Sequence, residues 1–447
     1  MKSVPFRCQL AAVLAASTFL AQSAAAQRQP AHYTVTDLGL LNGVNPGPLV
    51  IENNGLIAET VEVSNALHAA IGFLGTTIDL AKTGGLGGPN SGTFGVNERG
   101  QAAGEAETAD PDSEDFCAFG TQRVCAAFIW QNGVMSALPP LKDAYGVAGK
   151  NAAAKGINIF GQVAGVAENT STDSACPPYS PYQFKPVIWT NGEIQELPTS
   201  GIDANGKAFN DPDGVVFRID DRGQAVGATG KCTGFTGFSY LNGLHATLWQ
   251  NGSVIDLGNL GGIASPPPAT GLGNIGNFAY YVNRSGHVVG TSGTSDGSFH
   301  AFLWTPETLI QDLETIPGDV ASVGLSINDL GDIGGGSFPA GSLLANPTAA
   351  PRAFIRPAGG TMVDLNSLIS ANPSDLQLIT ACSINSRGEI IGLALDGQFN
   401  LHGYLATPSS DDEGASADLS SASRSTRFAY AWSIARQRMS LVFPIKR

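Results

Sequence analysis

The chain has 447 residues and a formal net charge of −14, with 38 acidic against 24 basic residues. This acidic balance disfavours binding to nucleic acid, whose phosphates require a basic surface, and adsorption to anionic lipid. With 56 Gly, 26 Pro and only 14% charged residues, the composition is typical of a protein built from many short strands and turns.

Residues 1–26 have the features of a cleaved secretory signal peptide. Lys2 and Arg7 give a charged start, an apolar Ala-rich run follows over residues 10–21, and small residues end the segment at Ala26. The run is short for a bilayer span, so we expect cleavage after Ala26 rather than retention as an anchor. No later segment of the sequence predicts a membrane span. We therefore expect a secreted protein, extracellular or periplasmic, whose mature charge is two units more negative.

The rest of the chain repeats one five-residue signature seven times: an apolar residue, Asn or Asp, two variable residues, then Gly. Asn or Asp can bond its own backbone two residues further on, and Gly accepts the left-handed conformation that closes a tight hairpin. The steps between these glycines are 45 to 63 residues, which fits one four-stranded blade with loop insertions. The signatures lie at 51–55, 96–100, 157–161, 219–223, 282–286, 327–331 and 384–388.

Each signature is followed by a second strand, a third strand that commonly ends in Trp, and a fourth strand. Asn-Gly pairs at 132–133, 191–192 and 251–252 predict type I′ turns between the third and fourth strands. The fourth strand ends in an acid followed by Leu, as at 256–257, and the acid suits an outer edge, where charge discourages edge pairing. A four-stranded unit of this kind must stack on its neighbours to cover both faces.

The two ends of the repeat region complement each other. Residues 33–39 have the pattern of a fourth strand without the preceding three, and the last repeat supplies strands one to three, ending at Leu405. Pairing these fragments would close a ring, whereas an open solenoid requires atypical capping repeats. The sequence therefore predicts an all-β, seven-bladed β-propeller over residues 33–408 whose termini share the closing blade. Residues 409–447 are expected to be a disordered linker and a basic tail, either surface-associated or unstructured.

The fifth copy resembles a known bacterial extracellular repeat. His-Ala-Phe-Leu-Trp at 300–304, followed by Asp-Leu at 312–313, is similar to the HAF repeat, which is named for His-Ala-Phe. Gly-Asn-Leu-Gly-Gly at 258–262 matches the stretch that follows Asp-Leu in that family. The resemblance extends over nearly the whole repeat region and is weaker where Glu52 and Arg356 break the pattern. It implies secretion and a propeller-like body, and it assigns no activity.

Binding is expected on one face of the propeller. The two hairpin turns of each blade lie on one face, and the links between second and third strands and between blades lie on the other. Here the hairpin turns are uniformly tight while the links vary, and variable loops on a rigid scaffold are where binding usually resides. The long links, mainly over blades two to five, are residues 105–126, 166–185, 198–213, 228–245 and 258–277.

Aromatic residues in or beside these links are candidates for a platform on which sugar or peptide would stack. The simpler alternative is that loop aromatics pack against their own loop. The candidates are Tyr179, Tyr182, Phe235, Phe238 and Tyr240.

Four cysteines also lie in the links. In an exported protein the natural pairs are Cys117 with Cys125 and Cys176 with Cys232, although sequence alone leaves swapped pairs open. Cys382, in a predicted inner strand, is expected to be a buried free thiol. Zinc is not predicted, because paired Cys-x-x-Cys and clustered His are absent from the sequence.

Two further sets of polar residues have simple interpretations. The acidic segment 110–115 offers the oxygen ligands that Ca²⁺ prefers, but it lacks the spacing and Gly of a recognised calcium loop. A solvated acidic tip is the simpler interpretation, and no other cofactor is predicted. His68, His245, His300 and His402 share one repeat position, which indicates a scaffold role.

The sequence contains no Gly-x-Ser-x-Gly elbow, His-Glu-x-x-His or phosphate loop. It therefore favours a non-enzymatic binding or scaffold module, monomeric, whose partner is an extracellular polysaccharide or protein. The alternative is a carbohydrate-active hydrolase or lyase with carboxylates near the propeller axis, because such pairs are close in space and not in sequence. Carboxyls converging in a deep axial pocket would favour the enzyme.

Overall fold

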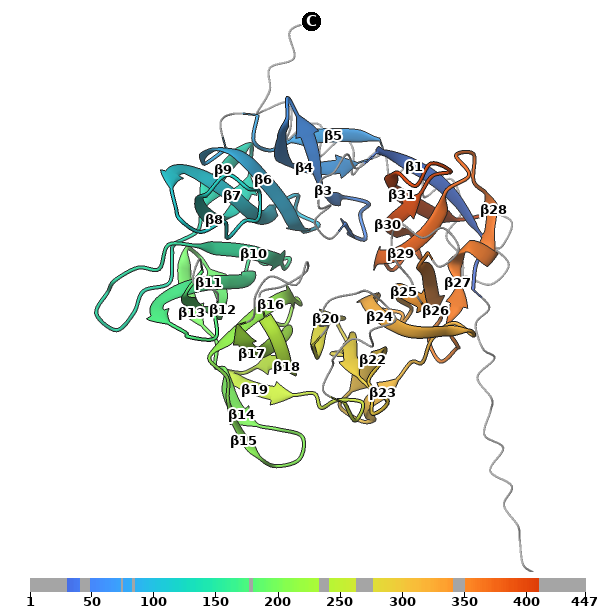
Figure 1. Ribbon diagram of the computed structural model, residues 1–447. Helices are drawn as coiled ribbons and strands as arrows, with labels where there is room; N and C mark the ends of the chain where they lie inside the picture. The colour runs from blue at the N-terminus through green and yellow to red at the C-terminus, as the bar shows by residue number, and fades with distance from the viewer. Residues whose placement is uncertain are drawn as a thin grey trace, which may run out of the picture.

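The structure is a computed structural model that describes residues 30–40, 49–73, 75–82, 85–176, 180–232, 241–262, 276–340 and 350–409. Within these ranges the chain forms a ring of seven sheets around a central axis (Figure 1). The fold is an all-β, seven-bladed β-propeller, as the repeat predicted. The expected signal peptide and nearly all of the expected tail lie outside the described residues.

Blades 1 to 6 are each made of four consecutive strands, with the first beside the axis and the last at the outer edge (Figure 1). Neighbouring strands within these blades pair antiparallel. From the axis outward, the strands are β2 (Val50–Ile51), β3 (Ile57–Val63), β4 (Ala66–Phe73) and β5 (Thr76–Asp79) in blade 1; β6 (Gly87–Val96), β7 (Ala102–Pro111), β8 (Arg123–Gln131) and β9 (Val134–Ala137) in blade 2; β10 (Ala152–Ile157), β11 (Val163–Thr172), β12 (Tyr182–Thr190) and β13 (Glu193–Glu196) in blade 3; β16 (Asp213–Ile219), β17 (Ala225–Cys232), β18 (Leu241–Gln250) and β19 (Ser253–Asp256) in blade 4; β20 (Phe278–Val282), β21 (Val288–Gly293), β22 (Phe299–Thr305) and β23 (Leu309–Asp312) in blade 5; and β24 (Asp319–Ile327), β25 (Ile333–Pro339), β26 (Arg352–Arg356) and β27 (Val363–Asp364) in blade 6.

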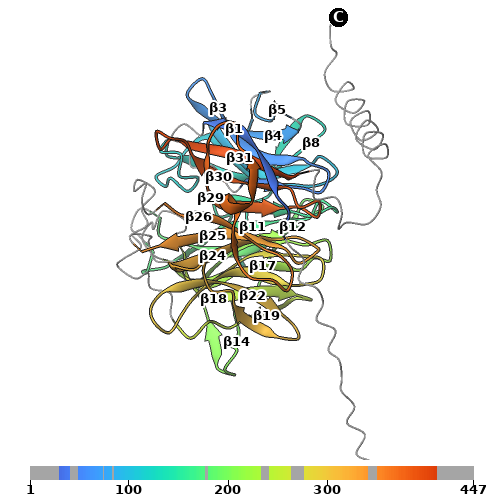
Figure 2. The same cartoon turned by 90° about the vertical axis from the view of Figure 1, so that its right-hand side faces the viewer.

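Blade 7 joins the two ends of the repeat region. Its inner strands are β29 (Gln377–Ile384), β30 (Ile390–Leu395) and β31 (Leu401–Pro408), and its fourth strand is β1 (Tyr33–Leu40). β1 lies antiparallel to β31, with Tyr33 opposite Pro408, and the two strands lie side by side in Figure 2. The predicted closure by a split blade is therefore confirmed. A fifth strand, β28 (Ile369–Ala371), pairs parallel with β1 at the outer edge.

Two short elements lie between blades. A hairpin of β14 (Ser200–Ile202) and β15 (Ala208–Asn210) stands between blades 3 and 4, and the 3-10 helix η2 (Leu365–Leu368) lies between blades 6 and 7. η2 is the one helix among the described residues, so none there is long and apolar enough to cross a bilayer.

The turns of the repeat have the predicted backbone conformations. The closing glycines of all seven signatures have φ between 75° and 87°, a backbone conformation that residues other than glycine rarely adopt. In the Asn-Gly turns of blades 2, 3 and 4, both residues have positive φ, which defines type I′. These turns lie on one face, which we call the turn face. The opposite face, which carries the links between second and third strands and between blades, is the loop face.

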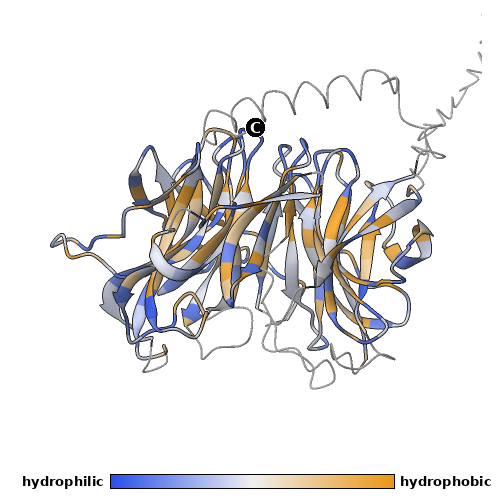
Figure 3. Ribbon diagram, turned by 90° about the horizontal axis from the view of Figure 1, so that it is seen from above, coloured by the Kyte–Doolittle hydropathy of each residue, from blue (hydrophilic) through white to orange (hydrophobic). Residues whose placement is uncertain are grey.

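Packing within a blade explains why His-Ala-Phe recurs. Hydrophobic residues are concentrated in the strands (Figure 3). In blade 5, Ala301 and Phe302 are fully buried, and Phe302 lies opposite Gly290 of the second strand. A Cβ on Gly290 would stand 1.9 Å from the carbonyl oxygen of Phe278 and 2.8 Å from the Phe302 ring. The same aromatic–glycine pairs occur in three other blades: Phe128 with Gly104, Phe354 with Gly335 and Tyr404 with Gly392.

Substituting Gly290→Ala is expected to destabilise the fold by roughly 1–3 kcal/mol, because the new methyl group overlaps main-chain and ring atoms that cannot move apart. Urea unfolding followed by tryptophan fluorescence measures the loss. Gly397→Ala is the matched control, since a Cβ there meets no atom within 4 Å. Equal stability of the two variants would contradict this packing argument.

Candidate functional site

The seven signature turns converge on the axis at the turn face and surround a pocket there. The pocket encloses about 100 Å³, and all seven blades contribute to its lining. It lies on the face opposite the one expected to bind. Sequence reasoning raised carboxylates near the axis as its enzyme alternative, but it treated the signature residues as turn formers and named none of them as lining a pocket.

A ring of hydrogen bonds between blades holds the pocket walls. In blade 5, the Asn283 side-chain oxygen accepts the main-chain N–H groups of Ser285 and His287, both at 3.0 Å. The Asn283 amide nitrogen donates to the Asn328 carbonyl of blade 6 at 3.0 Å. The same bond to the next blade occurs at four other interfaces, between 2.8 and 3.2 Å: Asn97 to Asn158, Asn158 to Asp220, Asn328 to Asn385 and Asn385 to Glu52. We call these amides the asparagine latch.

Two blades carry an acid at the latch position, and a carboxylate has no N–H to donate. After blade 1, where Glu52 stands, the neighbouring Asn53 amide instead donates to Glu98 at 3.3 Å. After blade 4, where Asp220 stands, Arg284 of blade 5 reaches back to the Asp221 carboxylate at 3.0 Å. Charged groups therefore enter the pocket at the two places where the amide ring is interrupted.

Two arginines bridge the axis. Arg284 pairs with Asp221 and approaches two other carboxylates, Asp329 at 3.5 Å and Glu98 at 4.0 Å. Arg218 donates to the carbonyl oxygens of two inner strands and lies over the Tyr281 ring. Its acceptors are Phe94 (3.1 Å) and Lys155 (3.4 Å), and its guanidinium carbon is 5.1 Å from the ring centre.

The pocket holds more acid than base, and the acids differ in protonation. Five carboxyl groups line it beside the two guanidinium groups: Glu52, Glu98, Asp220, Asp221 and Asp329. Burial raises the pKa of Glu52 to about 8; Arg218 lowers it, and the charge of Glu98 raises it further. Burial likewise raises the pKa of Tyr281 to about 12. Near neutral pH, Glu52 is therefore largely protonated and Tyr281 stays neutral.

The size of the pocket limits what it can hold. Pockets for small organic ligands usually enclose roughly 300–1,000 Å³. The axial pocket is several times smaller, and the Arg284 side chain already spans three of its carboxylates. In this conformation the pocket suits an ion or a single polar group of a ligand rather than a sugar ring.

On the loop face, the structure confirms the predicted disulfides. Cys117 is bonded to Cys125 within blade 2, and Cys176, in the link after β11 of blade 3, is bonded to Cys232 at the end of β17 in blade 4. Cys382 is free but only half-buried, against apolar residues between blades 7 and 1, and burial raises the pKa of its thiol to about 11. The description of Cys382 as a buried free thiol is therefore only partly right.

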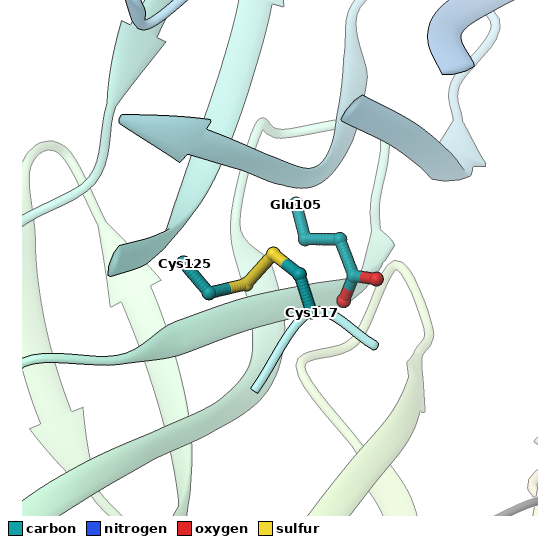
Figure 4. Close-up of side chains that lie close together, drawn as sticks. All are labelled: Glu105, Cys117 and Cys125. Carbon is teal, nitrogen blue, oxygen red and sulfur yellow. A yellow bond between two sulfur atoms is a disulfide. The ribbon is translucent and has the colours of Figure 1, made fainter. Parts of the chain in front are cut away.

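Both disulfides have a buried carboxyl beside them. Glu105 lies against the bond between Cys117 and Cys125 (Figure 4), and Asp213 lies beside the other disulfide. Because the sulfur atoms are bonded to each other, they offer no thiolate to a metal ion. Glu105 instead pairs with Lys155 at 2.9 Å across the blade interface.

The predicted aromatic platform cannot be assembled from the described residues. Tyr182 is half-buried at the start of β12. The other four candidates lie outside the described residues: Tyr179, Phe235, Phe238 and Tyr240.

The recurrent histidines have the expected scaffold position and a partner that the sequence reasoning missed. Nδ1 of the third-strand His contacts a fourth-strand acid at 2.9 Å in three blades: His68 with Asp79, His300 with Asp312 and His402 with Asp37. In blade 4, His245 contacts Asp211 at 2.8 Å instead, while Asp256 accepts the main-chain N–H of Ala204. The edge acids thus fix the third strand to the fourth as well as charging the edge.

The interpretation of residues 110–115 as a solvated acidic tip is wrong for two of its acids. Asp112 and Glu114 are buried, with 9% and 2% of their surfaces exposed, while Asp110 is exposed. The segment folds back between blades 2 and 3, where Asp112 accepts from Lys150 and Asn151.

No protein-family model matches the chain, and no curated protein matches it in sequence. Among solved structures, the chain is similar to the β-propeller domain of the Trilobed protease from Pyrococcus furiosus, described as having an open velcro topology. The likeness covers 88% of this chain and 100% of that domain, with a TM-score of 0.41 and 10% sequence identity.

Restoring the missing latch by Asp220→Asn is expected to stabilise the protein by roughly 1 kcal/mol, because the new amide can donate to the Asn283 carbonyl and a buried charge is removed. The lost ion pair to the half-exposed Arg222 is worth little. Asn158→Asp should have the opposite effect and lower the free energy of unfolding by roughly 1–3 kcal/mol. Chemical unfolding measures the stability of both variants, with the exposed Asn259→Asp as control. If both substitutions changed the free energy of unfolding in the same direction, the latch would be refuted.

The raised pKa of Glu52 predicts a specific pH dependence of stability. The folded state holds this proton more tightly than the unfolded chain, whose pKa is near 4.5. The contribution of Glu52 to the free energy of unfolding is therefore most favourable below pH 4.5 and declines as pH rises to about 8. Relative to Glu52→Gln, the wild type should lose stability across this window in urea unfolding at stepped pH. The exposed Glu62→Gln should run parallel to the wild type; a parallel Glu52→Gln would exclude the effect.

Proposed function

We propose that the protein is a non-enzymatic binding or scaffold module that recognises an extracellular polysaccharide or protein through its loop face. The observation that carries this proposal is the disulfide between Cys176 and Cys232, which joins the link after β11 in blade 3 to the end of β17 in blade 4. A cross-link from a link to a neighbouring strand end fixes that link in advance, so less conformational entropy is lost when a ligand binds. The disulfides also support export, because such bonds persist in oxidising compartments.

Tyr145 is the described side chain best placed to contact a ligand on this face. It lies in the link between blades 2 and 3 and is 93% exposed, an unusual degree for a tyrosine. The Asp143 carboxylate accepts the main-chain N–H groups of Tyr145 and Val147, both at 2.9 Å, which fixes the turn that presents the ring. Tyr side chains often serve as anchors at interfaces and as stacking surfaces for ligands. Sequence reasoning missed Tyr145 because its link, residues 138–151, was not counted among the long links.

A screen of the full chain against glycans and extracellular proteins tests this proposal. We expect saturable binding that Tyr145→Ala weakens about tenfold or more, as for an interface anchor. Phe160→Ala is the matched control, because Phe160 is also exposed (62%) but stands on the turn face. Absence of any saturable ligand, or equal weakening by both substitutions, would count against a recognition role for the loop face.

The carboxyl groups of the axial pocket are the observation behind a second candidate, a carbohydrate-active enzyme. Glycoside hydrolysis uses one protonated carboxylic acid and one ionised carboxylate. Glu52, whose raised pKa keeps it protonated near neutral pH, lies among ionisable acids such as Asp221 and Glu98. The small volume and the bridging Arg284 argue against a sugar ring in this pocket. Release of glycan fragments by the wild type and by Tyr145→Ala, but not by Glu52→Gln, would establish the enzyme.

A further inference from the structure

A second pocket lies on the turn face between blades 5 and 6, beside the axial pocket. It encloses about 360 Å³, which falls within the range of roughly 300–1,000 Å³ usual for small organic ligands. Its walls come from the signature turns and the third strands of both blades, and they include Leu303 and Thr305 of β22 and Leu330 of blade 6. The size of this pocket therefore allows a ligand that the axial pocket is too small to hold.

Blade 6 departs from the repeat at this pocket, because Arg356 of β26 stands where blades 2 to 5 have Trp. In those blades the indole packs in an apolar cluster between its own blade and the preceding one, as Trp189 does beside Leu141. The four tryptophans are Trp130, Trp189, Trp249 and Trp304. The pocket lies at the equivalent interface, between blades 5 and 6, so the space that an indole fills elsewhere is left open here.

The charge of Arg356 is not compensated. Arg356 is half-buried, and its guanidinium group makes no hydrogen bond or ion pair with any residue in the described part of the chain. Burial lowers the pKa of Arg356, and no described carboxylate counters that shift. By contrast, Arg352 at the start of the same strand pairs with Asp319 at 2.8 Å. Leaving a half-buried cation unpaired is costly, so this position favours an anion from outside the chain.

Asp329 is the one carboxylate among the described residues that line this pocket, and it is already engaged. It accepts the main-chain N–H of Arg284 at 3.0 Å, and the guanidinium group of Arg284 lies 3.5 Å from its other oxygen. The charge of Asp329 is therefore offset by Arg284 and not by Arg356.

His287 is a second departure from the repeat at the same pocket. In four other blades the residue after the signature Gly accepts a hydrogen bond from the latch Asn of its own turn, between 2.6 and 3.2 Å: Gln101, Gln162, Asp332 and Glu389. An imidazole stands there in blade 5, and its ring has no hydrogen bond to the residues that the structure describes. A neutral imidazole carries one N–H donor, so two donor groups without partners line one pocket.

We propose that the pocket between blades 5 and 6 binds a small organic carboxylate of about the size of one sugar acid. The guanidinium fork of Arg356 matches the two oxygens of a carboxylate, and the His287 ring supplies a further donor. Leu303 and Leu330 offer apolar contact to the carbon skeleton, for which the volume leaves room. Because this pocket is on the turn face, the proposal is independent of recognition by the loop face.

Calorimetric titration of the full chain with D-glucuronate tests the site, with D-glucose as the uncharged ligand of the same ring size. We expect saturable binding of glucuronate and no binding of glucose at the same concentrations. Arg356→Gln should weaken glucuronate binding about tenfold or more, because charge-assisted hydrogen bonds to the carboxylate are lost. Arg99→Gln is the matched control, since Arg99 is an exposed turn-face arginine of blade 2 and the substitution removes the same charge.

Arg356→Trp separates loss of the site from loss of the fold. The indole that blades 2 to 5 carry should fill the pocket and abolish glucuronate binding. The unfolding temperature should stay at or above that of the wild type, because an unpaired, half-buried cation is removed. Circular dichroism checks that each variant folds, and Arg356→Gln alone carries the test if Arg356→Trp does not.

Three outcomes would overturn the site. They are a wild type without saturable glucuronate binding, equal binding of glucose, and glucuronate binding that Arg356→Gln leaves unchanged.

Discussion

Five of the seven signature turns carry a buried Asn whose amide bonds in two directions at once. Its oxygen accepts N–H groups of its own turn, and its nitrogen donates to the corresponding carbonyl of the next blade, as in Asn283 and Asn328. One planar amide therefore sets both the shape of a turn and its position relative to its neighbour. Because the bond repeats between equivalent atoms at five of the seven interfaces, it favours a nearly constant step from blade to blade there, and the ring closes in seven steps.

This constraint divides the molecule into two unequal faces. On the turn face, the positions of the first turns are set by the latch, so the space at the axis stays small, and contacts to charged side chains bridge the two interfaces where the amide is missing. On the loop face, the links lie beyond the latch and have diverged in length, and disulfides and buried polar contacts hold them instead. Recognition is consequently proposed for the face whose residues the ring leaves free.

Local patterns predicted most of the fold, and contacts across blades account for most of what was missed. Gly290 and the Asn-Gly turns have local reasons to be where they are. The places of Cys176 and Cys232 in corresponding links of adjacent blades favoured their pairing, which the structure then selected over the swapped pairs. The donor role of Asn283 depends on where blade 6 stands, and the convergence of Glu52 with Asp221 joins residues far apart in the sequence. Glu114 was misjudged because an acidic segment ordinarily stays in water, and only the fold shows it enclosed.

The closing blade has a consequence for how the molecule is made. Thr34 of β1 and Thr407 of β31 are in contact although 373 residues separate them. The first strand to be synthesised therefore waits for nearly the last before it finds its partner, and contacts between such distant residues form slowly. During that wait β1 is an unpaired edge and the ring is open. A chain exported while still unfolded avoids this exposure inside the cell, since closure then takes place only where the complete chain has arrived.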